Sequence, residues 1–173
     1  SHSDILSHTT EIARNLFSRT KKILVLDGTY IYVQKSFNFN FQRETYSLHK
    51  SRNLVKMFMV VLTDGFTLEV TGPHQANVSD SDLLETLVQN EEFRRMHPPN
   101  EVIFIVDRGF RNAIEAVESH GYEIHMPACL ASKEKQLSTV KANKTRLVTK
   151  VRFIVEVVNG QVKQHFRYFH NTV

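Results

Sequence analysis

The sequence predicts an α/β domain in which helices cover a largely central, mixed sheet, and three observations support this fold class. Strand signals dominate the first half of the chain, and strand-then-helix units follow in the second half. At 173 residues the chain is long enough for one buried core, and its 41% hydrophobic and 23% charged content is typical of a globular domain. We expect a helical lead-in over residues 1–20 and a single domain over residues 21–173. Because the chain starts at Ser1 rather than Met, we expect it to be a segment of a longer protein.

Composition argues against two other classes of protein. No run of 18 apolar residues occurs, and no charged-then-apolar leader opens the chain, so we expect neither a membrane span nor a secretory signal. The single cysteine, Cys129, excludes an intramolecular disulfide framework and suits a reducing, intracellular compartment.

Two strand-rich segments lie in the first half. Residues 21–36 begin with an apolar run and continue in alternation, which predicts a strand. Residues 54–73 predict a hairpin, because Asp64-Gly65 supplies the positive φ angles that a tight turn requires. Asp64 therefore has a sufficient structural role and is not a candidate site residue.

Strand and helix signals alternate after residue 78. Ser79 is a good N-cap for a helix over residues 79–90, which carries an apolar stripe. Residues 101–121 predict a buried strand followed by a helix that Gly121 closes. Residues 122–127 predict a short strand, and the polar, basic residues 131–146 predict a loop.

Residues 151–169 carry two conflicting signals. Asn159-Gly160 between β-branched runs favours a hairpin. A stripe of apolar residues at helical spacing instead favours a helix, although Gly160 would cost that helix about 1 kcal/mol relative to alanine. Propensity alone slightly favours the hairpin.

Carboxylates at two predicted strand ends are the strongest functional signal. Asp27 follows the apolar run ILVL, and Asp107 follows VIFIV; both come within two residues of a glycine. Strand ends in an open α/β sheet meet at one crevice, where paired carboxylates would need a hard divalent cation such as Mg²⁺ or Mn²⁺ rather than zinc. On the helix interpretation, Glu156 is the candidate third ligand. The alternative is that each aspartate only forms a turn, and Asp80, a possible accessory acid, is equally explained by its place at a helix N-terminus.

Several motifs occur in a specific order: LDGTYIYVQKS, QRETYSLHKSRNLVK, GPHQANVSD, VDRGF and ANKTRLVTKVRFIVEVVNG. In this order they resemble the catalytic core of PIF/Harbinger-type DDE transposases, over about residues 21–168. The resemblance implies an RNase H-like fold and a helix over residues 151–169. It also implies that Asp27, Asp107 and Glu156 are the catalytic metal ligands for two Mg²⁺ ions, with Mn²⁺ as a substitute.

The implied activity is metal-dependent cleavage and joining of DNA, with transposon ends and target DNA as partners. The resemblance further implies a nuclear protein, a Myb/SANT-like accessory protein and a homo-oligomer, and no membrane partner. Two alternatives stay open: a host-retained, catalytically silent DNA-binding or scaffold protein, and an RNase H-like nuclease that cuts without joining.

Positive charge is concentrated in the last third of the chain. Residues 133–168 carry a net charge of +7, which leaves −3 for the remainder of a chain whose total is +4. Clustered cations favour a polyanion such as DNA, although a solvated basic face explains the charge equally well. The candidate DNA-binding residues are Lys50, Arg52, Arg108, Lys141, Lys144, Arg146, Lys150 and Arg152. Lys56 lies in the same segment as Lys50 and Arg52; this segment either follows the path of the substrate or, as is commoner, is a solvated edge strand rich in lysine.

Overall fold

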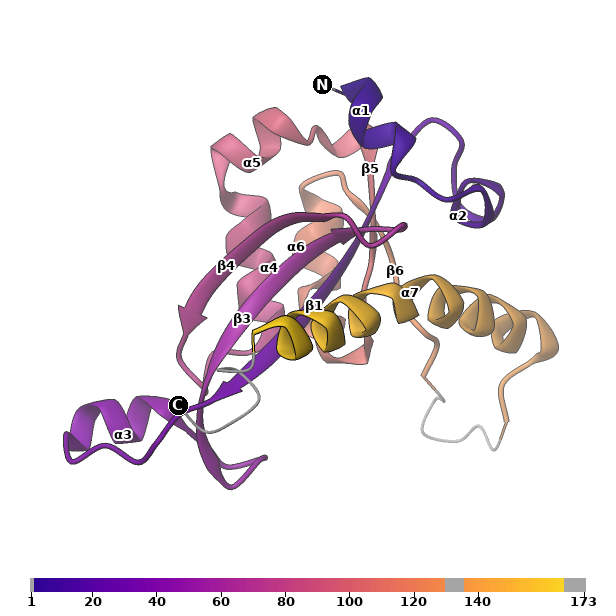
Figure 1. Ribbon diagram of the computed structural model, residues 1–173. Helices are drawn as coiled ribbons and strands as arrows, with labels where there is room; N and C mark the ends of the chain where they lie inside the picture. Colours follow the sequence, from indigo (N-terminus) through magenta and orange to yellow (C-terminus); the bar gives the residue numbers. More distant parts are fainter. Residues whose placement is uncertain (1, 130–135, 167–173) are drawn as a thin grey trace.

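Helices cover both faces of a six-stranded mixed sheet in the computed structural model, which describes residues 2–129 and 136–166 (Figure 1). The strands are β1 (Lys22–Tyr32), β2 (Tyr46–Ser47), β3 (Arg52–Leu62), β4 (Thr67–His74), β5 (Val102–Ile105) and β6 (Glu123–His125). The α-helices are α1 (His2–Ser7), α2 (Glu11–Leu16), α3 (Phe39–Thr45), α4 (Asp80–Gln89), α5 (Glu91–Met96), α6 (Ile114–Ser119) and α7 (Thr139–His165). Two 3₁₀ helices, η1 (Pro99–Glu101) and η2 (Arg108–Ala113), flank β5.

The six-stranded sheet combines antiparallel and parallel pairing: β3 is antiparallel to β1, β2 and β4, whereas the pairs β1–β5 and β5–β6 are parallel. The strand order is β2-β3-β1-β5-β6, with β4 also paired to β3. Strand β1 is antiparallel to β3, whereas β5 and β6 run parallel to it. This is the mixed, helix-flanked sheet of the RNase H-like fold, so the predicted fold class is confirmed.

The pairing of β1 changes along its length. Strand β5 pairs with β1 only from Lys22 to Val25, whereas β3 pairs with β1 as far as Tyr32. Strand β5 ends at Ile105, the partner of Val25, so beyond Val25 strand β1 continues without β5; we call the place where this pairing stops the β1–β5 fork.

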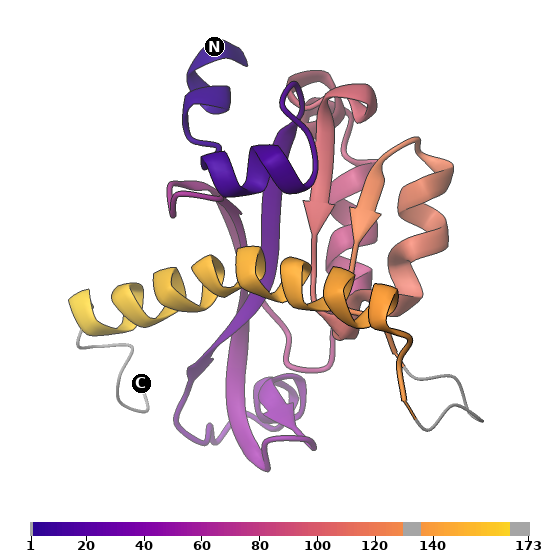
Figure 2. The same cartoon turned by 90° about the vertical axis from the view of Figure 1, so that its right-hand side faces the viewer.

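Two apolar clusters lie on opposite faces of the sheet, because successive side chains of a strand point to opposite sides. Leu24 and Leu26 of β1 pack on the face covered by α4 and α6. Ile23 and Val25 pack on the face covered by α7 (Figures 1 and 2). Each fully buried aliphatic side chain contributes about 1.5–3 kcal/mol, so these clusters hold the helices in place.

Helix α7 resolves the conflict at the C-terminal end of the chain. It is one continuous helix of 27 residues, so the hairpin favoured by Asn159-Gly160 is wrong and the helix implied by the family resemblance is confirmed. Its buried stripe packs on the sheet and outweighs the propensity cost of Gly160; the stripe consists of Val148, Val151, Val155 and Val158. The predicted loop over residues 131–146 is also wrong from Thr139 onward, because Ser138 caps the helix by accepting a hydrogen bond from the Lys141 backbone N–H. Residues 131–135 of that prediction lie outside the described residues.

Local signals in the middle of the chain are confirmed. The β3–β4 turn has Gly65 at φ 96°, and Asp64 accepts a hydrogen bond from the Phe66 backbone. Ser79 caps α4 in a reciprocal capping box with Asp82. Helix α5 had no clear sequence signal, because its stretch is short and rich in charge.

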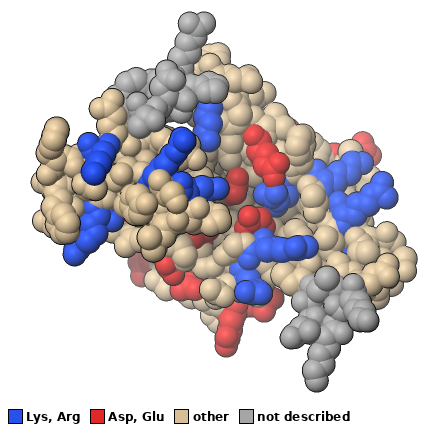
Figure 3. Space-filling model, turned by 90° about the horizontal axis from the view of Figure 1, so that it is seen from below, with Lys and Arg blue, Asp and Glu red and all other residues tan. Residues whose placement is uncertain are grey.

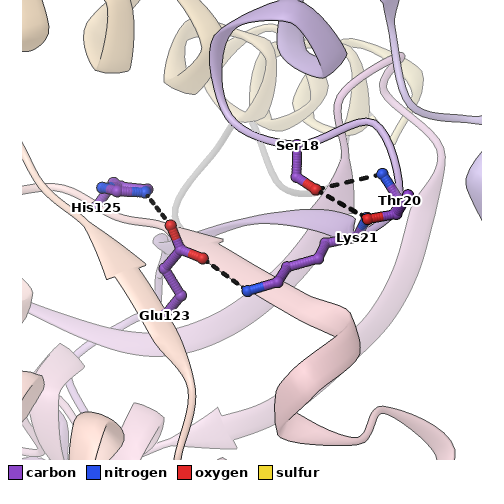
Figure 4. Close-up of polar contacts among 5 residues, drawn as sticks. All are labelled: Ser18, Thr20, Lys21, Glu123 and His125. Carbon is purple, nitrogen blue, oxygen red and sulfur yellow. Dashed lines mark hydrogen bonds and ion pairs between the residues drawn. The ribbon is translucent and has the colours of Figure 1, made fainter.

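A polar network fixes the beginning of β1 against β6 (Figure 4). The Lys21 ammonium donates to Glu123 Oε2 at 2.8 Å, and the His125 ring lies 2.9 Å from Glu123 Oε1. The hydrogen bond from Lys21 lowers the pKa of Glu123. Ser18 Oγ accepts hydrogen bonds from the backbone N–H groups of Thr20 and Lys21.

Among the helices that the structure describes, none combines the length and apolarity needed to cross a membrane.

Candidate active site

Asp27 lies in the middle of β1, at the β1–β5 fork. The prediction that it ends the strand is wrong, because antiparallel pairing with β3 carries β1 on to Tyr32. Parallel pairing with β5 stops at Val25, so Asp27 is the second residue after the strands separate. Its side chain has the same orientation as that of Val25 and therefore faces α7.

Asp107 lies on the other side of the fork. It follows β5 by two residues and is the N-cap of η2, where its Oδ1 accepts a hydrogen bond from the Gly109 backbone at 2.6 Å. A side chain at position 109 would bring a Cβ to 2.9 Å from the same oxygen. The absence of a side chain at Gly109 therefore allows the chain to turn closely around this carboxylate.

The two aspartates share one electrostatic environment. Burial raises the pKa of Asp27 to about 6, and the negative charges of Asp107 and then Asp80 contribute to the rise. Arg152 acts in the opposite direction. The pKa of Tyr30 is raised as well, first by burial and then by the same three carboxylates. The structure thus brings together the two aspartates that strand-end reasoning had selected.

Asp80 joins this cluster from the opposite face of the sheet. The position of a Cβ on Gly28 would lie 2.8 Å from Asp80 Oδ1, and that on Gly109 would lie 3.7 Å from Asp80 Oδ2. The side chain reaches the fork because Gly28 leaves room for it. In the sequence the only indication was an acid at the start of a helix, which is also ordinary helix-capping chemistry.

Helix α7 presents its polar face to Asp27. Glu156 is exposed and is paired with Arg152 one turn earlier. Asn159, one turn after Glu156, donates from Nδ2 to Asp27 Oδ2 at 2.9 Å. Asn159 was interpreted from the sequence as part of a hairpin turn, so its contact with Asp27 was not predicted. Its position three residues after Glu156, on the same face of the helix, could have indicated this contact.

The oxygen donors at the fork suit a hard divalent cation, because a cation would offset both the burial and the repulsion by Asp107 that raise the pKa of Asp27. Within residues 2–129 and 136–166, no three His, Cys, Asp or Glu side chains lie close enough together to hold one ion. Of the predicted ligands, Asp27 and Asp107 are near enough for the charge of one to raise the pKa of the other, while Glu156 is engaged by Arg152.

The candidate DNA-binding residues occupy three places. An exposed group lies on the first half of α7: Lys141, Lys144, Arg146 and Lys150. Lys50 and Arg52 are exposed near β2 and lie over the rings of Tyr30 and Tyr32, at 5.5 and 5.6 Å from the centroids. Arg108 donates to the Ala128 carbonyl at 3.0 Å and so has a structural contact.

Carboxylates and basic side chains meet on the face toward which β5 and β6 run. Figure 3 shows acidic side chains gathered around a hollow in the middle of this face, with Lys and Arg side chains on both sides of it.

Lys56 differs from the other lysines of its segment: it is only 8% exposed, so the expected solvated edge position is wrong. Its strand, β3, lies between β1 and β4.

Comparisons with known proteins place the chain in a family. A model of the DDE superfamily endonuclease family matches residues 26–173. Among solved structures, the chain is similar to a chain of a pre-cleavage Mos1 transpososome, at 12% identity and a TM-score of 0.43. That similarity covers 93% of this chain and 63% of the other chain, so the protein spans less than two thirds of its structural neighbour. No curated protein matches the chain. Because the family model matches residues 26–173, the chain belongs to the DDE superfamily endonuclease family.

Proposed function

We propose that the chain is the catalytic core of a Harbinger-type transposase, which cleaves DNA strands and joins them to target DNA with the help of two divalent cations. The observation that carries this proposal is the position of Asp27 and Asp107 at the β1–β5 fork, where the charge of Asp107 raises the pKa of Asp27, in a member of an endonuclease family. The order of sequence motifs supports the Harbinger type.

Three side chains are the proposed ligands: Asp27, Asp107 and Glu156. Bound Mg²⁺, or Mn²⁺ as a substitute, would supply Lewis-acid and charge-neutralising chemistry at the scissile phosphate. Asp27 must lose its proton to act as a ligand, and its pKa of about 6 means that it does so near neutral pH. Asn159 orients the Asp27 carboxylate by donating a hydrogen bond to Oδ2.

The reaction is a displacement at phosphorus. The attacking oxygen, from water or from a free 3′-hydroxyl, forms a new P–O bond while the bond from phosphorus to the 3′-oxygen breaks. The attacking oxygen loses its proton to solvent, and the released 3′-oxygen takes up a proton from solvent and becomes a hydroxyl group. With water the strand is nicked, and with a DNA 3′-hydroxyl the two strands are joined.

Glu156 and Arg152 change partners in this proposal. In the structure the two side chains form an ion pair on the exposed face of α7. Release of Glu156 toward the fork would free the Arg152 guanidinium, which has the geometry to bind a DNA phosphate. The exposed cations of the first half of α7 would extend this phosphate-binding surface, with affinity that falls as salt rises.

The test is a plasmid-nicking assay with Mg²⁺ or Mn²⁺ on the wild type and on Asp27→Asn, Asp107→Asn and Glu156→Gln. We expect each variant to lose cleavage while folding and DNA binding are largely retained. Asp64→Asn is the matched control, because Asp64 has a turn role in the β3–β4 hairpin and lies outside the acidic cluster. Full cleavage by Asp107→Asn would refute the proposal.

A second candidate is a host-retained DNA-binding or scaffold protein without catalysis. The ion pair that engages Glu156 favours it, because that carboxylate is the ligand that α7 should supply. Retained DNA affinity without any Mn²⁺ binding would support this candidate.

A nuclear location, a Myb/SANT-like accessory protein and a homo-oligomer belong to the first proposal and follow from the family resemblance.

A further inference from the structure

Lys56 is a lysine buried in the sheet. It is 8% exposed in the middle of β3, on the face covered by α4, and lies directly across from Tyr30 of β1. Its Nζ lies 5.7 Å from the centroid of the Tyr30 ring. Lysine is almost never buried to this degree unless its charge is compensated, so the partners of this ammonium group are informative.

The two hydrogen-bond partners of the Lys56 ammonium group, Val78 and Asp80, both belong to the segment that begins α4. The ammonium donates to the Val78 carbonyl at 2.6 Å and pairs with Asp80 Oδ1 at 3.2 Å. The Lys56 and Asp80 side chains are 10% and 18% exposed. A charge-assisted contact with so little solvent around it is strong, and it ties the beginning of α4 to β3.

The beginning of α4 in turn contacts both sides of the β1–β5 fork. Asp80 lies against Gly28, the residue after Asp27. Ser81 Oγ donates to the Gly109 carbonyl at 3.0 Å, within the turn that Asp107 caps. One helix end therefore contacts the strand that carries Asp27 and the turn that carries Asp107.

Electrostatics links the same groups. The negative charge of Asp80 contributes to the raised pKa of Asp27, so the three carboxylates repel one another. Lys56 supplies a cation to Asp80, and no ion pair of Asp27 or Asp107 with a cation is seen among the described residues. The excess negative charge is thus left at the two residues that the proposed function assigns to metal binding.

We propose that the Lys56–Asp80 ion pair positions the active site: it holds the beginning of α4 in the fork and thereby sets the separation of Asp27 and Asp107. This inference rests on the proposed function. Lys56 and Asp80 act through the two aspartates, so they are positioning residues.

The test removes both charges at once. Lys56→Met combined with Asp80→Asn leaves no unpaired buried charge, so the double variant should fold. We expect its Mn²⁺ affinity, measured by calorimetry with the metal alone, to fall by about 10-fold or more, the size found when residues that orient metal ligands are removed. Plasmid nicking should lose turnover by a similar factor while the KM for DNA stays nearly unchanged.

A matched control exists at the other end of β1. Lys22 is 2% exposed, lies 3.3 Å from Glu101 Oε2 and donates to the Met96 carbonyl. Lys22→Met with Glu101→Gln removes another ion pair of a buried lysine, here with a more exposed carboxylate, away from the fork. Its thermal stability should change about as much as that of the first double variant, with Mn²⁺ affinity and nicking unchanged.

Gly28→Ala gives an independent perturbation without a change of charge. The added Cβ would lie 2.8 Å from Asp80 Oδ1, so the carboxylate must move. We expect the same loss of Mn²⁺ affinity. Wild-type Mn²⁺ affinity in Gly28→Ala, or in a folded Lys56/Asp80 double variant, would overturn the inference. If the wild type nicks DNA and the double variant nicks it equally well, only the inference falls; if the wild type neither binds Mn²⁺ nor nicks, the proposed function falls with it.

Discussion

Replacing Asp27 by asparagine should stabilise the metal-free protein at neutral pH, although the same change should abolish the proposed catalysis. Asp27 is ionised among other carboxylates in a partly buried site, and that ionisation opposes folding. An amide at position 27 carries no charge, and its oxygen can still accept the hydrogen bond from Asn159. The variant therefore removes the repulsion while it keeps the contact with α7.

The magnitude follows from the pKa of Asp27, which is about 6 in the folded protein against an ordinary value of 3.8. A tenfold change in proton affinity corresponds to about 1.4 kcal/mol, so this difference corresponds to up to about 3 kcal/mol. Below pH 3.8 the carboxyl group is protonated in both states. Between pH 3.8 and 6 only the unfolded chain loses the proton, so the contribution of Asp27 to stability falls as the pH rises, and the loss is complete above pH 6.

The assay is urea unfolding of wild type and Asp27→Asn in EDTA between pH 4 and pH 8. The free energies of unfolding should nearly coincide at pH 4, and the variant should be more stable by up to about 3 kcal/mol at pH 8. This corresponds to a rise of about 6–12 °C in Tm. Glu118→Gln, on the exposed surface of α6, is the control for an unrelated loss of charge. Equal pH dependence of wild type and Asp27→Asn would refute the electrostatic reasoning.

Three further predictions concern other residues. Burial lowers the pKa of His97 to about 4, so the folded protein resists the protonation that the unfolded chain undergoes near pH 6.5. The free energy of unfolding should fall as the pH drops from 6.5 to 4, and His97→Gln should reduce this fall, measured by urea unfolding, by up to about 3 kcal/mol. The same fall in wild type and variant would contradict the prediction. Gly160→Ala should stabilise the protein by about 1 kcal/mol, because alanine is the better helix former and no atom lies within 4 Å of the added Cβ in α7. Gly121→Ala should destabilise the protein, because φ is 84° at this position. Denaturation midpoints of the two variants that move in the same direction would count against this prediction. Arg152→Ala should raise the pKa of Asp27 further, because the positive charge of Arg152 lowers it. The pKa can be measured by ¹³C NMR titration of the carboxyl group. An unchanged pKa in the variant would show that the two charges do not interact.

Local chemistry predicted the elements whose ends depend on neighbouring residues. The Asp64-Gly65 turn and the Ser79 cap require only a few residues to be specified, and both are present. The signals at residues 151–169 compete. An Asn-Gly pair favours a turn through its own backbone geometry, whereas an apolar stripe stabilises a helix only when it packs against another surface. The sheet face under α7 is that surface, and it is assembled from strands far away in the sequence.

The candidate site was predictable in part for the same reason. Apolar runs followed by acids selected Asp27 and Asp107, but their convergence depends on where β5 stops pairing with β1. Asp80 enters the cluster only because Gly28 lacks a side chain, which is a property of packing. Lys56 did carry a signal: it alternates with Leu54 and Phe58, which are both buried, so its side chain shares their face.

The change of pairing along β1 also divides the strand in its exposure to hydrogen exchange. At Leu24 and Val25 the strand is central, with β3 on one edge and β5 on the other. From Leu26 to Tyr32 no strand of the described chain pairs with the edge that faces the fork. Backbone amides that point to this edge therefore have no ladder partner, and they should exchange with solvent far faster than their neighbours. The strand that carries Asp27 is thus held by a strand ladder on one side only, and hydrogen exchange can follow its two edges separately.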